Sequence, residues 1–269
     1  MTFSLVARSP DGAQWGVAVA SKFLAVGAAV PAARYGVGAL ATQAFANLAY
    51  RPDGLRLLTE GLSAERALDA LTAGDEFRDQ RQAGVVDAAG GSASYTGSGC
   101  MPWAGGLTGD GWAAQGNILA GPEVLHAMAQ TFIDMNEKLP TALTAALLAG
   151  DRAGGDRRGR QSAALLVVSE NGGYGGGSDV LVDLRVDDHP DPVVELQRLL
   201  DLHGLYFGKP DPDALLPLEG TLLREVSDRL TMLGYPSLDA WAGVENYEER
   251  MVEGAIDPVV LAKLREASG

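Results

Sequence analysis

The second residue of the chain has the chemistry of a nucleophile. Thr2 opens a run to Arg8 that is rich in apolar and β-branched residues, which is typical of a strand. Initiator methionines are commonly removed before a small residue, and removal of Met1 would leave Thr2 with a hydroxyl and a free α-amine. An α-amine titrates near ~7.7–8.0, so it can accept the hydroxyl proton close to neutral pH. Thr2 would then act as in N-terminal threonine enzymes, or it simply begins an edge strand.

Two further residues could assist Thr2. Lys22 follows a second apolar run, residues 15–21, and the Asp-Gly turn between the runs predicts a β-hairpin. An ammonium beside Thr2 would depress the pKa of the α-amine, whereas the alternative is a solvated turn lysine. Gln43 ends the predicted strand 35–43, where a backbone N–H could stabilise an oxyanion. The alternative is a helix-entry turn in which Gln43 caps backbone groups.

Five other residues are candidates for substrate binding. Asp156, Arg157 and Arg158 lie in a glycine-flanked loop that precedes an apolar run. Arginine binds carboxylates in a bidentate manner, so this loop could hold an acidic substrate, or it is a surface loop with local ion pairs. Asn117 could offer its amide to a ligand or cap the helix that follows. Asn47, in the segment after the strand 35–43, completes this set.

Other reactive or metal-binding groups give weaker predictions. Cys100 would need a cationic neighbour or a helix N-terminus to form a thiolate, and a packed free cysteine is the alternative. The sequence Gly172 to Gly177 lacks the lysine and hydroxyl of a phosphate loop, which favours a hairpin loop. One cluster resembles metal ligands in composition but includes an Asp-Pro pair typical of a helix start: Asp187, Asp188, His189 and Asp191. We expect neither a metal nor another cofactor.

The composition bears on partners and compartment. The 269 residues carry a net charge of -14, which argues against nucleic acids and anionic membranes as partners. We find no leader-like charged and apolar opening, and no apolar run approaches the ~18 residues of a membrane span. A single cysteine excludes an internal disulfide and fits a reducing compartment. We therefore expect a cytoplasmic protein that binds neither nucleic acid nor membrane.

Strands and helix pairs must position these candidate residues. A strand at 35–43 follows the first hairpin, and the later elements are predicted in this order: helices 52–60 and 63–71, a hairpin of 82–88 and 92–96, a strand at 112–117, helices 122–135 and 140–148, and strands 162–168 and 179–184. Antiparallel strands with intervening helix pairs predict two sheets packed face to face, with helices outside.

Residues after Val193 form a different segment. A proline-rich connector at 209–212 precedes helices that begin near Thr221, Ser237 and Asp257. Apolar residues at helical spacing give the first of these helices a core face. We therefore predict an α+β domain over residues 1–192 and a small all-α domain over residues 193–269.

A set of motifs resembles one known family. They are Thr2-Phe3-Ser4 and residues 16–22, 41–47, 115–119, 154–163 and 182–190. Over about residues 1–190 the chain is similar to the family catalogued as domain of unknown function 1028. The resemblance implies a four-layer αββα sandwich, like that of the N-terminal nucleophile (Ntn) hydrolases. The helical segment resembles a family named for peptidoglycan binding; the alternative is an appendage that packs on the main domain or a partner subunit.

The resemblance to Ntn hydrolases implies an amidohydrolase that acts on a small-molecule amide. Thr2 would attack the carbonyl and form an ester that water releases, with Lys22 and Gln43 assisting. Proteasome-type members carry their lysine on a later strand, where this chain has Ala29, Val30 and Pro31. The competing hypothesis is a non-catalytic αββα binding or assembly module. We also expect a homo-oligomer.

Overall fold

The chain folds into two compact units, residues 1–200 and 201–269. The structure is a computed structural model that describes residues 2–269. Met1 lies outside the described residues, so its removal stays a prediction. No helix within residues 2–269 is long and apolar enough to cross a membrane. Within this described range, four short 3-10 turns occur among the other elements: Arg78–Gln80, Tyr174–Gly176, Pro212–Ala214 and Glu248–Arg250.

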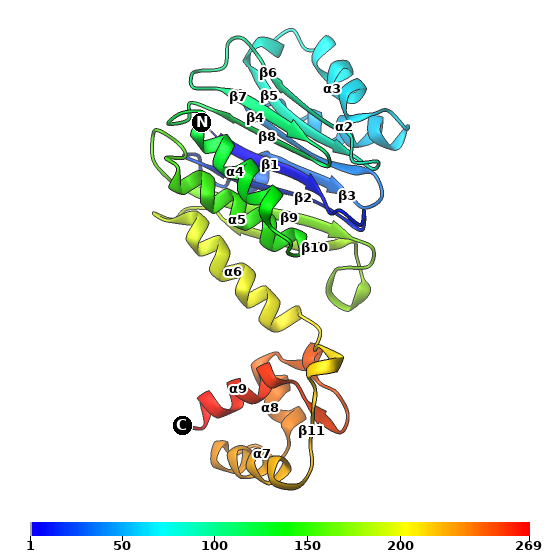
Figure 1. The fold of residues 1–269 in the computed structure, drawn as a ribbon, viewed down its shortest axis with the longest axis vertical. Coiled ribbons are helices and arrows are strands. Elements are labelled where there is room, and N and C mark those ends of the chain that lie inside the picture. Colours follow the sequence, from blue (N-terminus) through cyan, green and yellow to red (C-terminus); the bar gives the residue numbers. More distant parts are fainter. Residues whose placement is uncertain (1) are drawn as a thin grey trace. The chain divides into compact units, whose positions relative to one another are not determined.

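A six-stranded antiparallel sheet forms the centre of the first unit, in the order β10-β9-β2-β1-β8-β7 (Figure 1). Its strands are β1 (Thr2–Arg8), β2 (Gln14–Ser21), β7 (Gly105–Gly109), β8 (Trp112–Asn117), β9 (Ser162–Ser169) and β10 (Val180–Val186). Strand β1 lies between β2 and β8, with Thr2 opposite Ser21 on one side and Asn117 on the other. The first residue described is therefore in a central strand.

A second antiparallel sheet packs on the first, in the order β3-β4-β5-β6. Its strands are β3 (Pro31–Arg34), β4 (Gly38–Ala44), β5 (Arg81–Asp87) and β6 (Ser92–Thr96). In the β4–β5 pair Gln43 lies opposite Gln82. Strands β4 and β5 both contact β1, and β5 also contacts β8, so the two sheets meet face to face.

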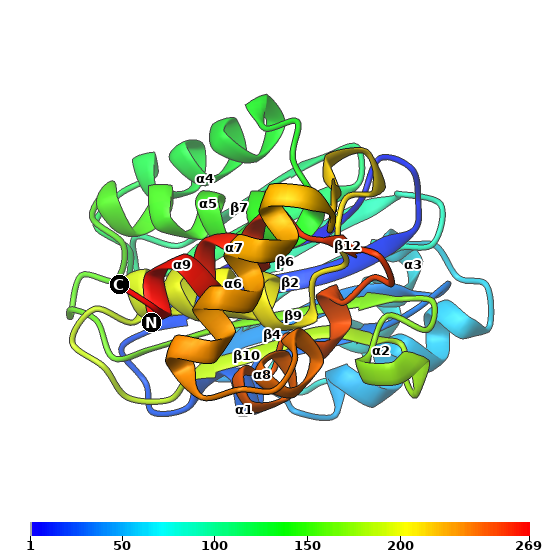
Figure 2. The same cartoon turned by 90° about the horizontal axis from the view of Figure 1, so that it is seen from below.

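Helix pairs cover the outer faces of the two sheets, as Figure 2 shows from below. The pair α4 (Glu123–Asp134) and α5 (Leu139–Arg152) packs on the large sheet. The pair α2 (Tyr50–Thr59) and α3 (Ala64–Ala73) packs on the small one. The short helix α1 (Val26–Ala29) contacts β2 and β9, and α6 (Pro192–Phe207) begins in the first unit. The predicted antiparallel sheets are confirmed.

Alternation along β1 divides its side chains between two layers. Phe3 and Leu5 join the core beneath α4 and α5, whereas Val6 joins the core between the sheets. Thr2 and Ser4 share the face of Val6. The layer between the sheets is therefore apolar around Val6 and polar toward Thr2.

The second unit is mainly helical, and the predicted C-terminal helical region is confirmed. Its helices are α7 (Gly220–Leu233), α8 (Leu238–Glu245) and α9 (Pro258–Ala267). The side chains of Ser237 and Asp257 cap α8 and α9 as predicted. The core gathers around Trp241. The unit also contains a pair of two-residue strands, β11 (Leu216–Pro217) and β12 (Ala255–Ile256), too short for their sequence to mark as strands.

Strands β3 and β7 were not predicted from the sequence. Strand β3 begins at Pro31, which cannot donate to a ladder but is tolerated as the first residue of a strand. Strand β7 has the sequence Gly-Gly-Leu-Thr-Gly, whose glycines lower strand propensity. Packing against neighbouring strands overrides local preference in both cases.

Gly84 of β5 leaves the space that the Gln115 side chain occupies. A Cβ at Gly84 would lie 1.9 Å from Gln115 Oε1. The Gln115 side chain is fully buried, and its Nε2 donates to Ser4 Oγ at 2.6 Å. A larger residue at position 84 must therefore displace a buried, hydrogen-bonded amide.

We expect Gly84→Ala to lower the free energy of unfolding by about 1–3 kcal/mol, because the added methyl group overpacks this layer. Urea denaturation measures the change. Gly74→Ala is the matched control, because the nearest atom to its added Cβ is a carbonyl oxygen at 3.9 Å. The double variant Gly84→Ala/Gln115→Ala should lose less unfolding free energy than the two single variants lose in sum. Strict additivity in this double-mutant cycle would contradict the assignment of the clash.

Candidate functional site

Four amide side chains lie between the two sheets, at the end where β1 begins. Each belongs to a residue that is at most 2% exposed. They are Gln43 of β4, Gln82 of β5, and Gln115 and Asn117 of β8. Buried amides need hydrogen-bond partners, so their contacts determine how this end of the sheets is organised.

Gln43 connects the small sheet to β1. Its Nε2 lies 3.2 Å from the carbonyl oxygen of Thr2, 2.9 Å from Gln82 Oε1 and 3.2 Å from the carbonyl oxygen of Gln115. Its Oε1 accepts a hydrogen bond from Ser4 Oγ at 2.7 Å. The side chain of Gln43 therefore holds the backbone of Thr2 in place.

Gln82 extends the network to β8. Its Nε2 lies 2.7 Å from the carbonyl oxygen of Gly116 and 2.9 Å from Thr96 Oγ1, while its Oε1 accepts from Asn117 Nδ2 at 2.9 Å. Sequence reasoning did not single out Gln82, Gln115 or Ser4. Alternation along predicted strands could have placed them on inward faces, but only the packing of the sheets shows that they meet.

The hydroxyl of Thr2 is held by a second hydroxyl. Thr2 is 7% exposed, and its Oγ1 lies 3.0 Å from Ser21 Oγ, with either atom able to donate. Ser21 follows from the hairpin register, which pairs the first residue of β1 with the last residue of β2. Sequence reasoning missed Ser21 and selected its neighbour Lys22.

Lys22 lies at the end of β2, beside the arginine-rich loop. Its backbone N–H donates to Asp156 Oδ2 at 2.7 Å, and its ammonium donates to the carbonyl oxygen of Arg160 at 3.2 Å. The Asp156 side chain is buried and also accepts from the backbone N–H and the guanidinium of Arg158. The structure thus brings Lys22, Asp156 and Arg158 together, one residue beyond Ser21.

The backbone of Arg157 joins this loop to β8. Its N–H donates to the carbonyl oxygen of Ile118 at 3.4 Å, and Ile118 directly follows Asn117. Further along the loop, Arg160 forms an ion pair with the buried Asp151 at 2.8 Å. The loop is therefore anchored next to the strand end that carries Asn117, and the substrate-binding role of its side chains stays a prediction.

A pocket of about 290 Å³ opens where β4 and β8 end. It is lined by Ala44, Phe45, Gln80, Gly99, Cys100, Met101, Asn117 and Ile118. Ala44 and Ile118 have φ angles of 66° and 51°, in the left-handed region that is unfavourable for residues with a Cβ. These two residues directly follow Gln43 and Asn117. Strained backbone of this kind clusters at functional sites.

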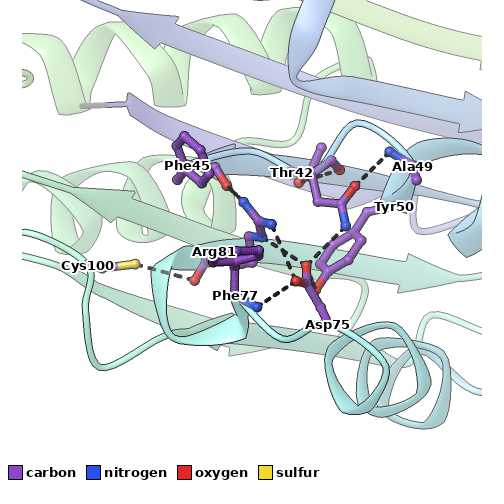
Figure 3. A network of polar contacts seen from close by, with 9 residues as sticks. Thr42, Phe45, Ala49, Tyr50, Asp75, Phe77, Arg81 and Cys100 are labelled. Carbon is purple, nitrogen blue, oxygen red and sulfur yellow. Dashed lines mark hydrogen bonds and ion pairs between the residues drawn. The ribbon is translucent and has the colours of Figure 1, made fainter.

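A second polar cluster lies next to Phe45, as Figure 3 shows, and includes Arg81, which donates to the carbonyl oxygen of Phe45. Arg81 Nε is 2.8 Å from Asp75 Oδ2, and both side chains are buried. Asp75 also accepts hydrogen bonds from Tyr50 and Asn47, each at 3.0 Å. The hydrogen bonds from Arg81 hold the pKa of the Asp75 carboxyl far below its usual range. Burial raises the pKa of the Tyr50 hydroxyl.

The structure places Asn47 in this second cluster rather than beside Thr2. Its Nδ2 binds Asp75, and its Oδ1 accepts from the backbone N–H of Ala49 at 3.1 Å. The guanidinium of Arg81 lies 5.0 Å from the Phe45 ring centroid. Asn47 therefore supports the pocket through Asp75, Arg81 and Phe45, and a direct contact with substrate stays a prediction.

Two other candidate groups have structural roles in this arrangement. Cys100 is half-buried, its Sγ donates to the carbonyl oxygen of Arg81, and burial raises the pKa of its thiol. A thiol protonated at neutral pH is a poor nucleophile. His189 Nδ1 accepts from the backbone N–H of Asp191 just before α6. Within residues 2–269 no three His, Cys, Asp or Glu side chains gather closely enough to hold a metal ion.

Comparison with known proteins identifies the family. The model described as "Family of unknown function (DUF1028)" matches residues 2–196. The chain belongs to this family. A crystal structure of protein SPO2555 from Silicibacter pomeroyi, a DUF1028 protein, is 32% identical with a TM-score of 0.69, over 76% of this chain and 86% of that chain. A second model, "Putative peptidoglycan binding domain", matches residues 206–264. Among the curated proteins, none matches.

We expect Asp75→Asn to destabilise the protein by about 3–5 kcal/mol at pH 7, because it leaves the buried Arg81 guanidinium without its counter-charge. Since the pKa of Asp75 is depressed in the folded state, its ion pair stabilises the protein above the unfolded pKa of about 3.9. That stabilisation is lost as the pH falls toward the folded value. The difference in unfolding free energy between wild type and Asp75→Asn should therefore narrow below about pH 4.

Guanidinium denaturation at pH 7 and pH 3 measures this difference. Asp53→Asn is the control, because Asp53 pairs with Arg56 on the exposed surface of α2. Losing this exposed pair should lower the unfolding free energy by at most about 1 kcal/mol. A pH-independent difference for Asp75→Asn would show that the ion pair is not the cause.

Proposed function

We propose that the DUF1028 domain is an Ntn-type amidohydrolase in which Thr2, exposed by removal of Met1, attacks a small amide. The observation that carries the proposal is the placement of Thr2. It begins a central strand with its hydroxyl bound to Ser21, its carbonyl bound to Gln43, and its cross-strand neighbour Asn117 lining the pocket. The order of helix pair, sheet, sheet and helix pair supports assignment to the αββα sandwich class.

The proposed reaction has two halves. The free α-amine of Thr2 takes the proton from Oγ1 as the Oγ1–carbon bond forms, and a backbone N–H at the strand end after Gln43 stabilises the oxyanion. The C–N bond then breaks, and the ammonium returns its proton to the departing amine. Water attacks the ester with the α-amine again as base, which releases the carboxylic acid and restores Thr2.

Lys22 enters this proposal through its charge. Its ammonium donates to the carbonyl oxygen of Arg160, which is a neutral partner. This contact therefore leaves a positive charge next to the end of β2. A nearby positive charge disfavours the protonated form of the α-amine and lowers its pKa. We also propose that Asn117 contacts the substrate. Asp156, Arg157 and Arg158 would lie at the edge of the bound substrate, on the far side of Ile118. Asn47 would act indirectly, through its hydrogen bond to Asp75.

We assign this reaction to a domain of residues 1–192 and propose a separate peptidoglycan-binding-like role for residues 193–269. The family match to the second unit supports that role. A cytoplasmic location is then compatible only with binding of wall precursors or fragments inside the cell. A small-molecule amide as substrate and a homo-oligomer as the functional form belong to the same proposal.

The competing proposal is a non-catalytic binding module. The observation that favours it is the burial of Thr2, whose hydroxyl is already engaged by Ser21. The two proposals differ in a simple measurement. A binding module needs no free α-amine, whereas the enzyme needs Met1 removed. The intact mass of the mature protein shows whether Met1 is absent.

We expect Thr2→Ala to lose hydrolysis of a small-amide library almost completely and Thr2→Ser to retain part of it, because serine keeps a hydroxyl and an amine. The pH profile of kcat/KM should rise through an apparent pKa below ~7.7. Lys22→Met should move that pKa upward and reduce turnover near pH 7, since the nearby positive charge is gone.

Lys138→Met is the control, because it removes the same charge from an exposed residue at the start of α5. An unchanged pH profile for Lys22→Met would remove Lys22 from the mechanism. Robust hydrolysis by Thr2→Ala, or quantitative retention of Met1 in an active protein, would overturn Thr2 as the nucleophile.

A further inference from the structure

The pocket beside Asn117 is lined by uncharged side chains. Ala44, Phe45, Met101 and Ile118 supply apolar surface. Gln80 and Asn117 contribute amides, and the thiol of Cys100 is kept protonated because burial raises its pKa. A pocket with this lining offers dispersion contacts and a few neutral hydrogen bonds, which suits an apolar group.

Three guanidinium groups near this pocket are engaged by carboxylates. Arg81, whose carbonyl oxygen accepts from Cys100, is paired with Asp75. In the loop beyond Ile118, Arg158 is paired with Asp156, and Arg160 with Asp151. A substrate carboxylate that enters the pocket would lose its hydrating water. To pair with one of these guanidinium groups, it would first have to displace the carboxylate already bound there. Desolvation of an ionised group that lacks a matching partner is strongly unfavourable.

Two large apolar side chains are exposed at the mouth of the pocket. Phe45 is 63% exposed and Met101 is 60% exposed, so a ligand can still bury much of their surface. The Phe45 ring is backed by Arg81 through a cation–π contact. The pocket, about 290 Å³, lies just below the usual range for ligand sites, about 300–1,000 Å³. It therefore accepts only a short group.

We propose that this pocket binds the acyl part of the substrate and that the acyl group is short, apolar and uncharged. The inference rests on the proposed function, because it takes Thr2 as the attacking residue. Asn117 is both the cross-strand neighbour of Thr2 and a lining residue, so a carbonyl group held near Asn117 lies next to the start of β1. Phe45 and Met101 then select the chain that extends from that carbonyl.

The test compares two probes of equal chain length, butyryl 4-nitroanilide and succinyl 4-nitroanilide, which differ in a terminal carboxylate. We expect the mature wild-type protein to prefer the butyryl probe by roughly tenfold or more in kcat/KM. Met101→Glu should lower kcat/KM for the butyryl probe by roughly tenfold, mainly through KM, because it places a carboxylate at the mouth of the pocket. Met232→Glu is the matched control, since Met232 in α7 is 65% exposed and distant in sequence from the pocket.

Binding of both probes to the Thr2→Ala protein, followed by calorimetry, separates the two proposals. If Thr2→Ala binds the butyryl probe and Met101→Glu weakens that binding while no probe is hydrolysed, the pocket inference stands and the proposed reaction fails. Faster hydrolysis of the succinyl probe would keep the reaction and overturn the pocket inference in favour of the Arg157–Arg158 loop. Absence of both binding and hydrolysis would overturn both.

Discussion

The buried amides between the two sheets impose the constraint on which the first unit depends. A buried polar group left without a partner costs about 1–3 kcal/mol, so amides in this layer need hydrogen-bond partners in the facing sheet or in their own. Gln43 does so by bonding to Thr2 and Gln82, and Gln82 by bonding to Gly116 and Asn117. A one-residue slip of β4, β5 or β8 within its sheet would turn the amides of that strand toward the helices and break their contacts. The network therefore determines the register of the sheets and the position of Thr2.

The same network separates the part of the layer that stabilises the fold from the part that contains the candidate site. Around Val6 the layer is apolar and closed, whereas around Thr2 it is polar and leads to the pocket. Ala44 and Ile118 adopt left-handed conformations directly after Gln43 and Asn117. Such conformations cost of order 1–2 kcal/mol each, so surrounding contacts must hold them. Backbone hydrogen bonds beside the pocket supply such contacts: the N–H of Ile118 donates to the carbonyl oxygen of Met101, and the N–H of Phe45 donates to that of Gln80.

Local sequence patterns were sufficient for most elements and for part of the site. The apolar runs and the Asp-Gly turn predict the β1–β2 hairpin, and its register places Ser21 opposite Thr2. Capping residues such as Ser63 and Ser237 mark helix starts that the structure contains. The pairing of Arg81 with Asp75, and of Gln43 with Gln82, depends on how α3 leads into β5 and how the sheets stack. The role of Asn47 could not be predicted from the sequence, because its partner Asp75 lies 28 positions away. Asn47 was therefore predicted to bind substrate.

The charge distribution adds a final argument about the proposed reaction. A net charge of -14 creates a field that favours protonation of an α-amine and would hold it in the inactive ammonium form. At physiological ionic strength, screening limits the range over which a surface charge acts to about 8 Å. Charged groups next to Thr2 therefore affect the pKa of its α-amine more than the rest of the surface does. Asp156, the buried carboxylate near the end of β2, is paired with Arg158, which leaves the Lys22 ammonium as a positive contribution in that region. At low ionic strength, where screening is weak, the negative net charge also repels anionic substrates. For the proposed reaction, a neutral amide is therefore the substrate class that fits both the uncharged pocket and the net charge of the chain.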